Sequence, residues 1–425
     1  MPQTYRRISL GFFQKPLENG ESAICRSLLA LRELGKQVKH WSIPFSGGKD
    51  STAVTALVLW AIENGYVERP KTLTVLRSDT TQELPELNHN AEILMAEVRR
   101  RGFRAVTVGP VLKDRFYVNI LGRGLLPVHA SLRGRWCTRV LKVKPMEEAL
   151  AKTAEAVAGE KFLMMSGVRF NESRSRDAKL NDSKQVAFAA CSKDSGECGS
   201  GGIWMDKKMS GKYVALPLIV NWRECIVYDF LQGWFVFNEK NFYRVDLVPS
   251  ARETVLQNRL VTRGSFLRKG HGLERFTQPV AKMYGQHEDG LVERSLRFGC
   301  LGCSVVSEDR MTIEAAKKNP KLTPILELRA VWEEMRNPAF RLWKPSKNQN
   351  FSKGHHGPLT IKARKYFLPK ILDIQRRSEV VLVTDADLVE IERCWREGVY
   401  PRGWTGDEIL ACDAPQTCGF FVNRV

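Results

Sequence analysis

Short apolar strand patterns alternate with helical patterns along the first half of this 425-residue chain. The patterns predict strands at residues 40–45, 71–76, 104–108, 162–168 and 213–220. They predict helices at residues 51–63, 87–101, 146–158 and 222–235. Strands that alternate with helices indicate a parallel, doubly wound α/β sheet. The polar stretch 171–211 predicts a long loop, and from residue 236 the sequence is helical and basic. We therefore expect two domains, residues 1–235 and 236–425, of which the second is mainly helical.

The composition limits the partners and the compartment of the protein. The chain has 66 Lys and Arg against 47 Asp and Glu, a formal net charge of +19. This surplus favours a polyanionic partner, because phosphate contacts release counterions; the alternative is a solvated basic surface. No early apolar stretch has a signal-peptide pattern, and none is long enough to span a bilayer. We expect a cytoplasmic protein with no membrane partner, whose ten cysteines are free thiols, metal ligands or catalytic thiols.

The stretch SGGKDS follows the first predicted strand and opens a predicted helix. It therefore stands at the carboxyl end of a sheet strand, where open α/β sheets bind ligands. Its glycines let backbone N–H groups approach an anion, the helix dipole favours negative charge, and Lys49 can contact a phosphate. The spacing is not that of a Walker loop, and a glycine turn without function is the alternative. We expect phosphate binding by Ser46, Gly47, Gly48, Lys49, Asp50 and Ser51.

Two further polar stretches follow strands of the same predicted sheet. SDTTQELPEL (residues 78–87) comes after the second strand, and GVRFNESRSR (residues 167–176) comes after the fourth. Arginines of the second stretch can hold phosphate oxygens through paired hydrogen bonds, although isolated arginines are more often surface charges. Because strand ends of a parallel sheet meet at one edge, these stretches are candidates for the same nucleotide site.

Together the three stretches resemble the PP-loop ATP pyrophosphatases, and in particular their phosphoadenylylsulfate (PAPS) reductase branch. SGGKDS is similar to the SGGxDS pyrophosphate-binding element, SDTTQELPEL to a D-T-x-x-E-x-P turn, and GVRFNESRSR to a G-x-R-x-x-E-S-x-x-R element. The resemblance implies a Rossmann-like, adenine nucleotide α-hydrolase-like fold that binds ATP and Mg²⁺. It implies nucleotide contacts at Asp79, Thr80, Gly167 and Arg169, and catalytic roles for Lys49, Asp50, Arg169 and Arg176. Asp50 either orients Lys49 or binds the magnesium ion.

A CxxC pair and a distant cysteine are candidate metal ligands. RFGCLGCSVV contains Cys300 and Cys303, and RWCTRVLKVKP places Cys137 among basic residues. A CxxC pair alone fits zinc, an iron-sulfur cluster or a redox dithiol. The residue types therefore leave the kind of site open.

The cysteine stretches, with GPLTIKARKYFLPKILDIQRR, most resemble the DndC and SspD family of DNA phosphorothioation proteins. That family joins a PP-loop domain to a four-iron four-sulfur (4Fe-4S) cluster, and the resemblance covers about residues 41–377. It implies cluster ligands at Cys137, Cys300 and Cys303. The family usually has further cysteines shortly before the CxxC segment, but residues 226–299 have none, so for the fourth ligand we choose Cys198, beside glycine-rich turns. The alternatives for the fourth position are Cys191, Cys225, for which we expect a buried thiol, and no fourth cysteine at all.

The resemblance implies an ATP pyrophosphatase that is also a sulfurtransferase. A DNA phosphate oxygen would attack the α-phosphorus of ATP, and sulfur from a cysteine desulfurase would then replace the adenylylated oxygen. Other proteins of the phosphorothioation system would be partners. The alternatives are a reductase of PAPS or a related sulfonucleotide, a tRNA thiolase, and a non-catalytic nucleic-acid-binding subunit.

Overall fold

The computed structural model divides the chain into two compact units. It describes residues 20–128, 135–157, 160–169, 204–205, 213–220, 222–235, 237, 270–284, 299–306, 308–345 and 355–414. The first unit comprises Met1–Arg77, His89–Thr107 and Ala149–Ser295, and the second comprises Ser78–Asn88, Val108–Glu148 and Leu296–Val425. The domain boundary expected at residue 235 falls inside the first unit and stays a prediction.

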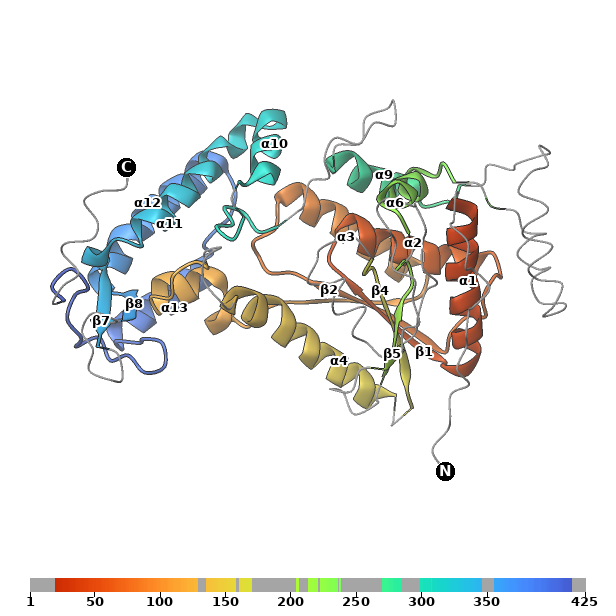
Figure 1. Ribbon diagram of the computed structural model, residues 1–425, viewed down its shortest axis with the longest axis horizontal. Helices are drawn as coiled ribbons and strands as arrows, with labels where there is room; N and C mark the ends of the chain where they lie inside the picture. Colours follow the sequence, from red (N-terminus) through yellow and green to blue (C-terminus); the bar gives the residue numbers. More distant parts are fainter. Residues whose placement is uncertain are drawn as a thin grey trace. The chain divides into compact units, whose positions relative to one another are not determined.

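A six-stranded sheet, with the order β3-β2-β1-β4-β6-β5, forms the centre of the first unit (Figure 1). Its strands are β1 (His40–Phe45), β2 (Thr72–Ser78), β3 (Arg104–Val108), β4 (Phe162–Ser166), β5 (Trp204–Met205) and β6 (Tyr213–Pro217). β1 is parallel to β2 and β4, and β4 is parallel to β6. The predicted α/β fold with a parallel sheet is thus confirmed. The short β5, antiparallel to β6, lies in the stretch where we expected only loop.

The strand order reverses between β1 and β4. From β1 the chain proceeds to β2 and β3 on one side, and it later returns to β4 and β6 on the other. Such a reversal is the point at which open α/β sheets bind ligands, beyond the carboxyl ends of the strands. The stretches SGGKDS and GVR follow the two strands that flank this point.

The helices with residues in the first unit are α1 (Gly20–Gln37), α2 (Lys49–Glu63), α3 (Pro85–Arg100), α4 (Lys144–Ala156), α6 (Glu224–Gln232) and α9 (Glu274–Met283). Almost all of α2 is buried, because its sequence is apolar around the whole circumference rather than on one face. It packs against β1 and β4 and against α6 and α9. The four predicted helices are all present, with ends that shift by a few residues. α6 ends three residues early because Gly233 adopts a left-handed φ of +77°.

The second unit is mainly helical, as expected. Its elements include α10 (Arg310–Lys318), α11 (Leu328–Glu334), α12 (Ile361–Ser378) and α13 (Asp385–Arg396). Single π-helical turns occur at Val118–Gly122 and Thr138–Val143, and tighter helical turns at Leu112–Asp114, Pro320–Glu327 and Pro338–Phe340. An antiparallel pair, β7 (Arg341–Lys344) and β8 (His355–Leu359), is the exception to the helical pattern. No helix of the described residues is long and apolar enough to cross a membrane.

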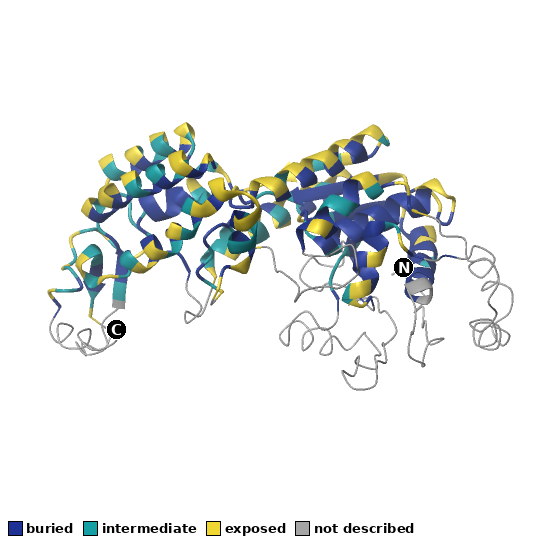
Figure 2. Cartoon of the chain, turned by 90° about the horizontal axis from the view of Figure 1, so that it is seen from above, coloured by how far each residue is buried: buried dark blue, intermediate teal, exposed yellow. Residues whose placement is uncertain are grey.

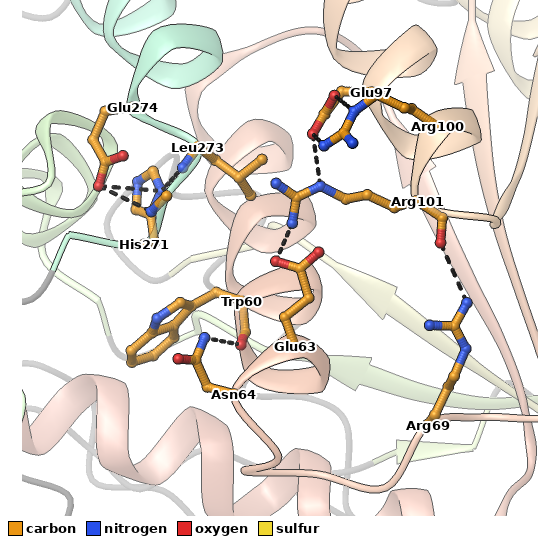
Figure 3. A network of polar contacts seen from close by, with 11 residues as sticks. Trp60, Glu63, Asn64, Arg69, Glu97, Arg100, Arg101, His271, Leu273 and Glu274 are labelled. Carbon is orange, nitrogen blue, oxygen red and sulfur yellow. Dashed lines mark hydrogen bonds and ion pairs between the residues drawn. The ribbon is translucent and has the colours of Figure 1, made fainter.

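In each unit, buried residues lie on the faces of the helices and strands that pack together, and exposed residues lie on their outer faces (Figure 2). One buried side chain, Glu97 of α3, belongs to a network of charges (Figure 3). Arg100 donates to its two carboxylate oxygens at 2.7 and 2.6 Å, and Arg101 donates at 2.8 Å. Hydrogen bonds from Arg100, together with those from Arg101, lower the pKa of Glu97 to about 2 against the opposing effect of burial. Arg101 also pairs with Glu63 of α2, so the network connects α3 with α2.

We predict that Glu97→Gln lowers the free energy of unfolding at pH 7 by on the order of 1–3 kcal/mol, because two guanidinium groups lose their shared carboxylate. The stabilisation from the lowered pKa is present above the unfolded value of about 4.5 and is lost as the pH falls toward 2. Chemical denaturation between pH 7 and pH 3 measures both effects. The wild type should lose more stability than the variant over this range. Glu397→Gln, which removes an exposed partner of Arg393, should change stability by less than about 0.5 kcal/mol.

Candidate functional site

The loop between β1 and α2 is closed by its own serines. The Ser46 amide donates to the Ser51 hydroxyl at 3.2 Å, and the two hydroxyl oxygens are 3.1 Å apart. Ser51 in turn donates to the Gly48 carbonyl at 3.0 Å. Gly47 has a φ of +76°, a conformation that costs little only for glycine. The loop therefore turns sharply into the N-terminus of α2, where backbone N–H groups and the helix dipole favour an anion.

Charged side chains from three segments meet at this loop. The Nζ of Lys49 lies 3.5 Å from Asp50 and 3.2 Å from Glu224, and Lys49 itself is buried. On its other side Asp50 accepts a hydrogen bond of 2.5 Å from Arg169 Nε. Arg169 also donates to the carbonyl of Trp222 at 3.3 Å. Asp50 thus holds two cations, which favours the orienting role over a direct role in magnesium binding.

Gly167 is required by packing against the same loop. A Cβ at this position would lie 2.8 Å from the backbone carbon of Asp50 and 3.1 Å from the Ser51 nitrogen. No side chain can be accommodated there without moving the start of α2. The glycine of the GVR stretch therefore permits the close approach of the loop after β4 to the SGGKDS loop.

Two tyrosines and a glutamate complete this region, and sequence reasoning missed all three. The Lys49 amide donates to the Tyr284 hydroxyl at 3.4 Å, and the Lys49 ammonium lies 4.7 Å from the centre of the Tyr284 ring. Burial, with the nearby charge of Glu224, raises the pKa of Tyr228. Glu224 lies within PLIVNWRECIVYDFL (residues 217–231), at the start of a predicted helix that carries no predicted nucleotide-binding residue. For Tyr284 no sequence signal existed, because it lies after α9 and far from every motif.

The SDTTQELPEL turn belongs to the second unit, so Asp79 and Thr80 lie in a different unit from SGGKDS. The amide and hydroxyl of Thr80 donate to the Glu83 carboxylate, the hydroxyl at 2.6 Å. Thr81 adopts a φ of +62°, which is strained for a β-branched residue and is typical of functional turns. Gly109 supports the turn, since a Cβ there would lie 2.5 Å from the Asp79 carbonyl oxygen.

The three predicted cysteine ligands of the described chain lie near one another in the second unit. Burial raises the pKa of Cys300 to about 11; Lys142 opposes this shift, and Glu83, Cys303 and Cys137 add to it. Burial and the charge of Cys303 likewise raise the pKa of Cys137. The CxxC turn is held by Trp332 Nε1, which donates to the Gly302 carbonyl at 2.9 Å, and by Arg329, which donates to the Cys303 carbonyl at 2.8 Å.

The described residues include three of the four predicted metal ligands, Cys137, Cys300 and Cys303. Within the ranges that the structure describes, no three His, Cys, Asp or Glu side chains are close enough together to hold a metal ion. Cys198, Cys191 and Arg176 lie outside the described residues. Cys225 is exposed rather than buried, because it lies on the outer side of α6. Cys137 and Cys303 both raise the pKa of Cys300, and Cys303 also raises that of Cys137, whereas Lys142 lowers that of Cys300. Sulfur is the donor type that binds zinc or an iron-sulfur cluster, so the residue types fit such a group.

The segment that contains SGGKDS and GVR is similar to a known protein family. Residues 40–234 match the family model of the phosphoadenosine phosphosulfate reductase domain. The chain contains a PAPS reductase-like domain of the PP-loop superfamily. This domain holds SGGKDS, GVR and PLIVNWRECIVYDFL, and its family is named for an enzyme. A search of curated proteins gave no match to the chain.

Solved structures similar to the chain are distant. A PAPS reductase from Candida auris, in complex with phosphate, is 11% identical, covers 58% of this chain and 89% of its own, and has a TM-score of 0.29. FMN adenylyltransferase from Candida glabrata, with FMN and an ATP analogue, is 13% identical over 52% and 63% of the two chains, with a TM-score of 0.29. The U34-tRNA thiolase NcsA from Methanococcus maripaludis, with its 4Fe-4S cluster, is 12% identical over 74% and 78%, with a TM-score of 0.24. Likenesses this weak carry no conclusion about activity.

We predict that Tyr284→Phe tightens the binding of inorganic pyrophosphate to the PAPS reductase-like domain by about two- to tenfold. The Lys49 amide donates its hydrogen to the Tyr284 hydroxyl. Without this hydroxyl, the amide is free to donate to a phosphate oxygen. Isothermal titration of the wild type and the variant measures the change. Tyr366→Phe, which alters an exposed tyrosine of α12, should leave the affinity unchanged. Weaker binding by Tyr284→Phe would instead mean that the hydroxyl contacts the bound anion.

We predict that iodoacetamide modifies Cys300 slowly at pH 8 and that the rate rises roughly tenfold per pH unit up to pH 10 without a plateau, because only the thiolate reacts. Lys142→Gln should slow the reaction at each pH, since Lys142 is the cation that lowers the pKa of Cys300. Peptide mass spectrometry of the modified protein measures the rates. Lys144→Gln, which removes the partner of Asp114, is the control and should have no effect. A plateau near pH 9 would contradict the raised pKa.

Proposed function

We propose that the chain is an ATP pyrophosphatase and sulfurtransferase that places sulfur in the DNA backbone. The observation that supports this most directly is in the second unit. The Leu301 amide of the CxxC turn donates to the Gln82 carbonyl of the SDTTQE turn at 2.7 Å. Glu83 of that turn also raises the pKa of Cys300. A turn that resembles a nucleotide-binding element is therefore bonded to the turn that carries the candidate sulfur-handling cysteines.

In the proposed reaction, ATP binds with its phosphates over Ser46–Ser51. A non-bridging oxygen of a DNA phosphate attacks the α-phosphorus, and the bond to pyrophosphate breaks. Lys49 and the N-terminus of α2 stabilise the negative charge that develops on the leaving pyrophosphate. Asp50 and Glu224 hold the Lys49 ammonium, and Arg169 holds Asp50. The adenylylated oxygen then leaves with AMP when a sulfur nucleophile attacks the backbone phosphorus.

The sulfur would be held at Cys137, Cys300 and Cys303, after its transfer from a cysteine desulfurase. These thiols fit a 4Fe-4S cluster in donor type, and Cys198 is the proposed fourth ligand. A bound cluster would supply iron that binds and delivers sulfide. Magnesium would be held mainly by the phosphates, because Asp50 and Glu224 both pair with Lys49. The net charge of +19 supports a polyanionic substrate.

We expect phosphorothioate dinucleotides in nuclease-digested DNA from cells that contain the wild-type protein with its partner proteins, because sulfur replaces a non-bridging oxygen. The dinucleotides should be absent with Cys300→Ser, which removes a sulfur-holding thiol, and with Lys49→Ala, which removes the charge on pyrophosphate. Mass spectrometry of the digest measures them. Cys412→Ser, a change at a cysteine outside the CxxC turn, is the matched control and should leave them in place.

A reductase of PAPS or a related sulfonucleotide is the second candidate, and the family match of residues 40–234 favours it. The same purified protein distinguishes the candidates. Pyrophosphate release from ATP that DNA stimulates supports the proposal, and stimulation by tRNA alone would indicate a tRNA thiolase. Release of sulfite from PAPS, without pyrophosphate release from ATP, would replace the proposal with the reductase.

A further inference from the structure

The hydroxyl of Tyr117 is a buried polar group that lacks a hydrogen-bond partner among the described residues. Tyr117 is 2% exposed, and within the part of the chain that the structure describes its Oη atom forms no hydrogen bond. A buried hydroxyl without a partner is rare and costs stability, so it requires an explanation. Packing does not supply one, because a phenylalanine would fill the same space against Phe116 and Trp332.

The position of Tyr117 points to the CxxC turn. Its ring centre lies 6.3 Å from that of Trp332, whose Nε1 donates to the Gly302 carbonyl between the two cysteines. Burial, followed by the negative charge of a Cys300 thiolate, raises the pKa of Tyr117. The phenol therefore remains a protonated donor at every physiological pH.

The neutral thiol of Cys300 is a weak hydrogen-bond acceptor, whereas an anionic sulfur is a strong one. Two sulfur species share this chemistry: the outer sulfur of a persulfide on Cys300, and a sulfide of a cluster bound at Cys300. Either would bring negative charge to a buried position where Lys142 is the cation that acts on Cys300.

We infer that Tyr117 is a positioning residue that donates its hydroxyl hydrogen to an anionic sulfur held at Cys300. The inference rests on the proposed function, since it assumes that the cysteines carry sulfur, but it requires neither ATP nor DNA. It gives the orphaned hydroxyl an acceptor and the buried anionic sulfur a donor.

The test compares Tyr117→Phe with Ser42→Ala, which removes another fully buried hydroxyl that lacks a partner among the described residues but lies in β1 of the first unit. In one arm the protein receives glutathione persulfide. The Cys300 thiolate attacks the outer sulfur, the donor's sulfur–sulfur bond breaks, glutathione thiolate leaves, and no net oxidation occurs. Cyanide then converts the bound outer sulfur to thiocyanate, which is measured. We expect Tyr117→Phe to retain sulfur about tenfold less well than the wild type, and Ser42→Ala to match the wild type.

In the second arm the protein receives ferrous iron, an equal amount of ferric iron, and sulfide without oxygen, so that cluster formation needs no further oxidant. Visible absorbance reports uptake, and redox titration reports the midpoint potential. Tyr117→Phe should lower the potential, because a hydrogen bond to sulfur stabilises the more negative, reduced form. A change in the first arm identifies a persulfide, and a change in the second identifies a cluster.

Three results would overturn the inference: wild-type protein that takes up sulfur in neither arm, Tyr117→Phe that behaves like the wild type in both arms, and Ser42→Ala that shows the same loss. A fourth is a lower melting temperature of sulfur-free Tyr117→Phe, equal in a Cys300→Ser background, because the hydroxyl would then have a partner within the protein. Sulfur retention through Tyr117 without any DNA phosphorothioate would remove the proposed function and leave this inference intact.

Discussion

The ion pair between Arg169 and Asp50 is the contact on which the candidate nucleotide site depends. It joins the loops that follow β1 and β4, the two strands that flank the reversal of the sheet. Both groups are largely buried, so removing one partner would leave an uncompensated charge in a medium of low dielectric constant. Asp50 also holds Lys49, and Lys49 holds Glu224 at the start of α6. One chain of alternating charges therefore fixes the only lysine of the loop relative to three segments of the domain.

Local patterns were sufficient to predict the parts of this site that lie at strand ends. The alternation of strand and helix depends on residues close in sequence, and it gave β1, β3 and α2 with almost their observed bounds. Gly167 was predicted from a resemblance, and the structure adds the reason that only a glycine lets this loop approach the backbone of Asp50. Glu224 and Tyr284 were missed, because their contact with Lys49 depends on how α6 and α9 pack against α2. No periodicity in a single sequence encodes such a contact.

The second unit shows the same division between what sequence can and cannot predict. The grouping of Cys137 with Cys300 and Cys303 came from a resemblance, and in the fold Cys137 and Cys303 add to the rise in the pKa of Cys300 that burial causes. The bond between Leu301 and Gln82 had no sequence signal, since it joins two backbone groups that any residues would carry. The sequence did not single out Tyr117, because a buried aromatic residue is ordinarily part of a hydrophobic core. What distinguishes Tyr117 from a core residue is that its hydroxyl forms no hydrogen bond with the described residues, and only the structure shows this.

Burial and reactivity oppose each other at Cys300. Burial favours the neutral thiol, whereas the thiolate is the form that attacks sulfur or binds iron. Any such event must therefore displace a proton from Cys300, and its free energy becomes more favourable as the pH rises toward the pKa of the thiol. Lys142 reduces this cost and Glu83 increases it. Because Glu83 also accepts the hydrogen bonds of Thr80, a ligand that changes the SDTTQE turn would change the charge environment of Cys300 as well. The proton affinity of the thiol is thus the property through which the two turns can influence each other.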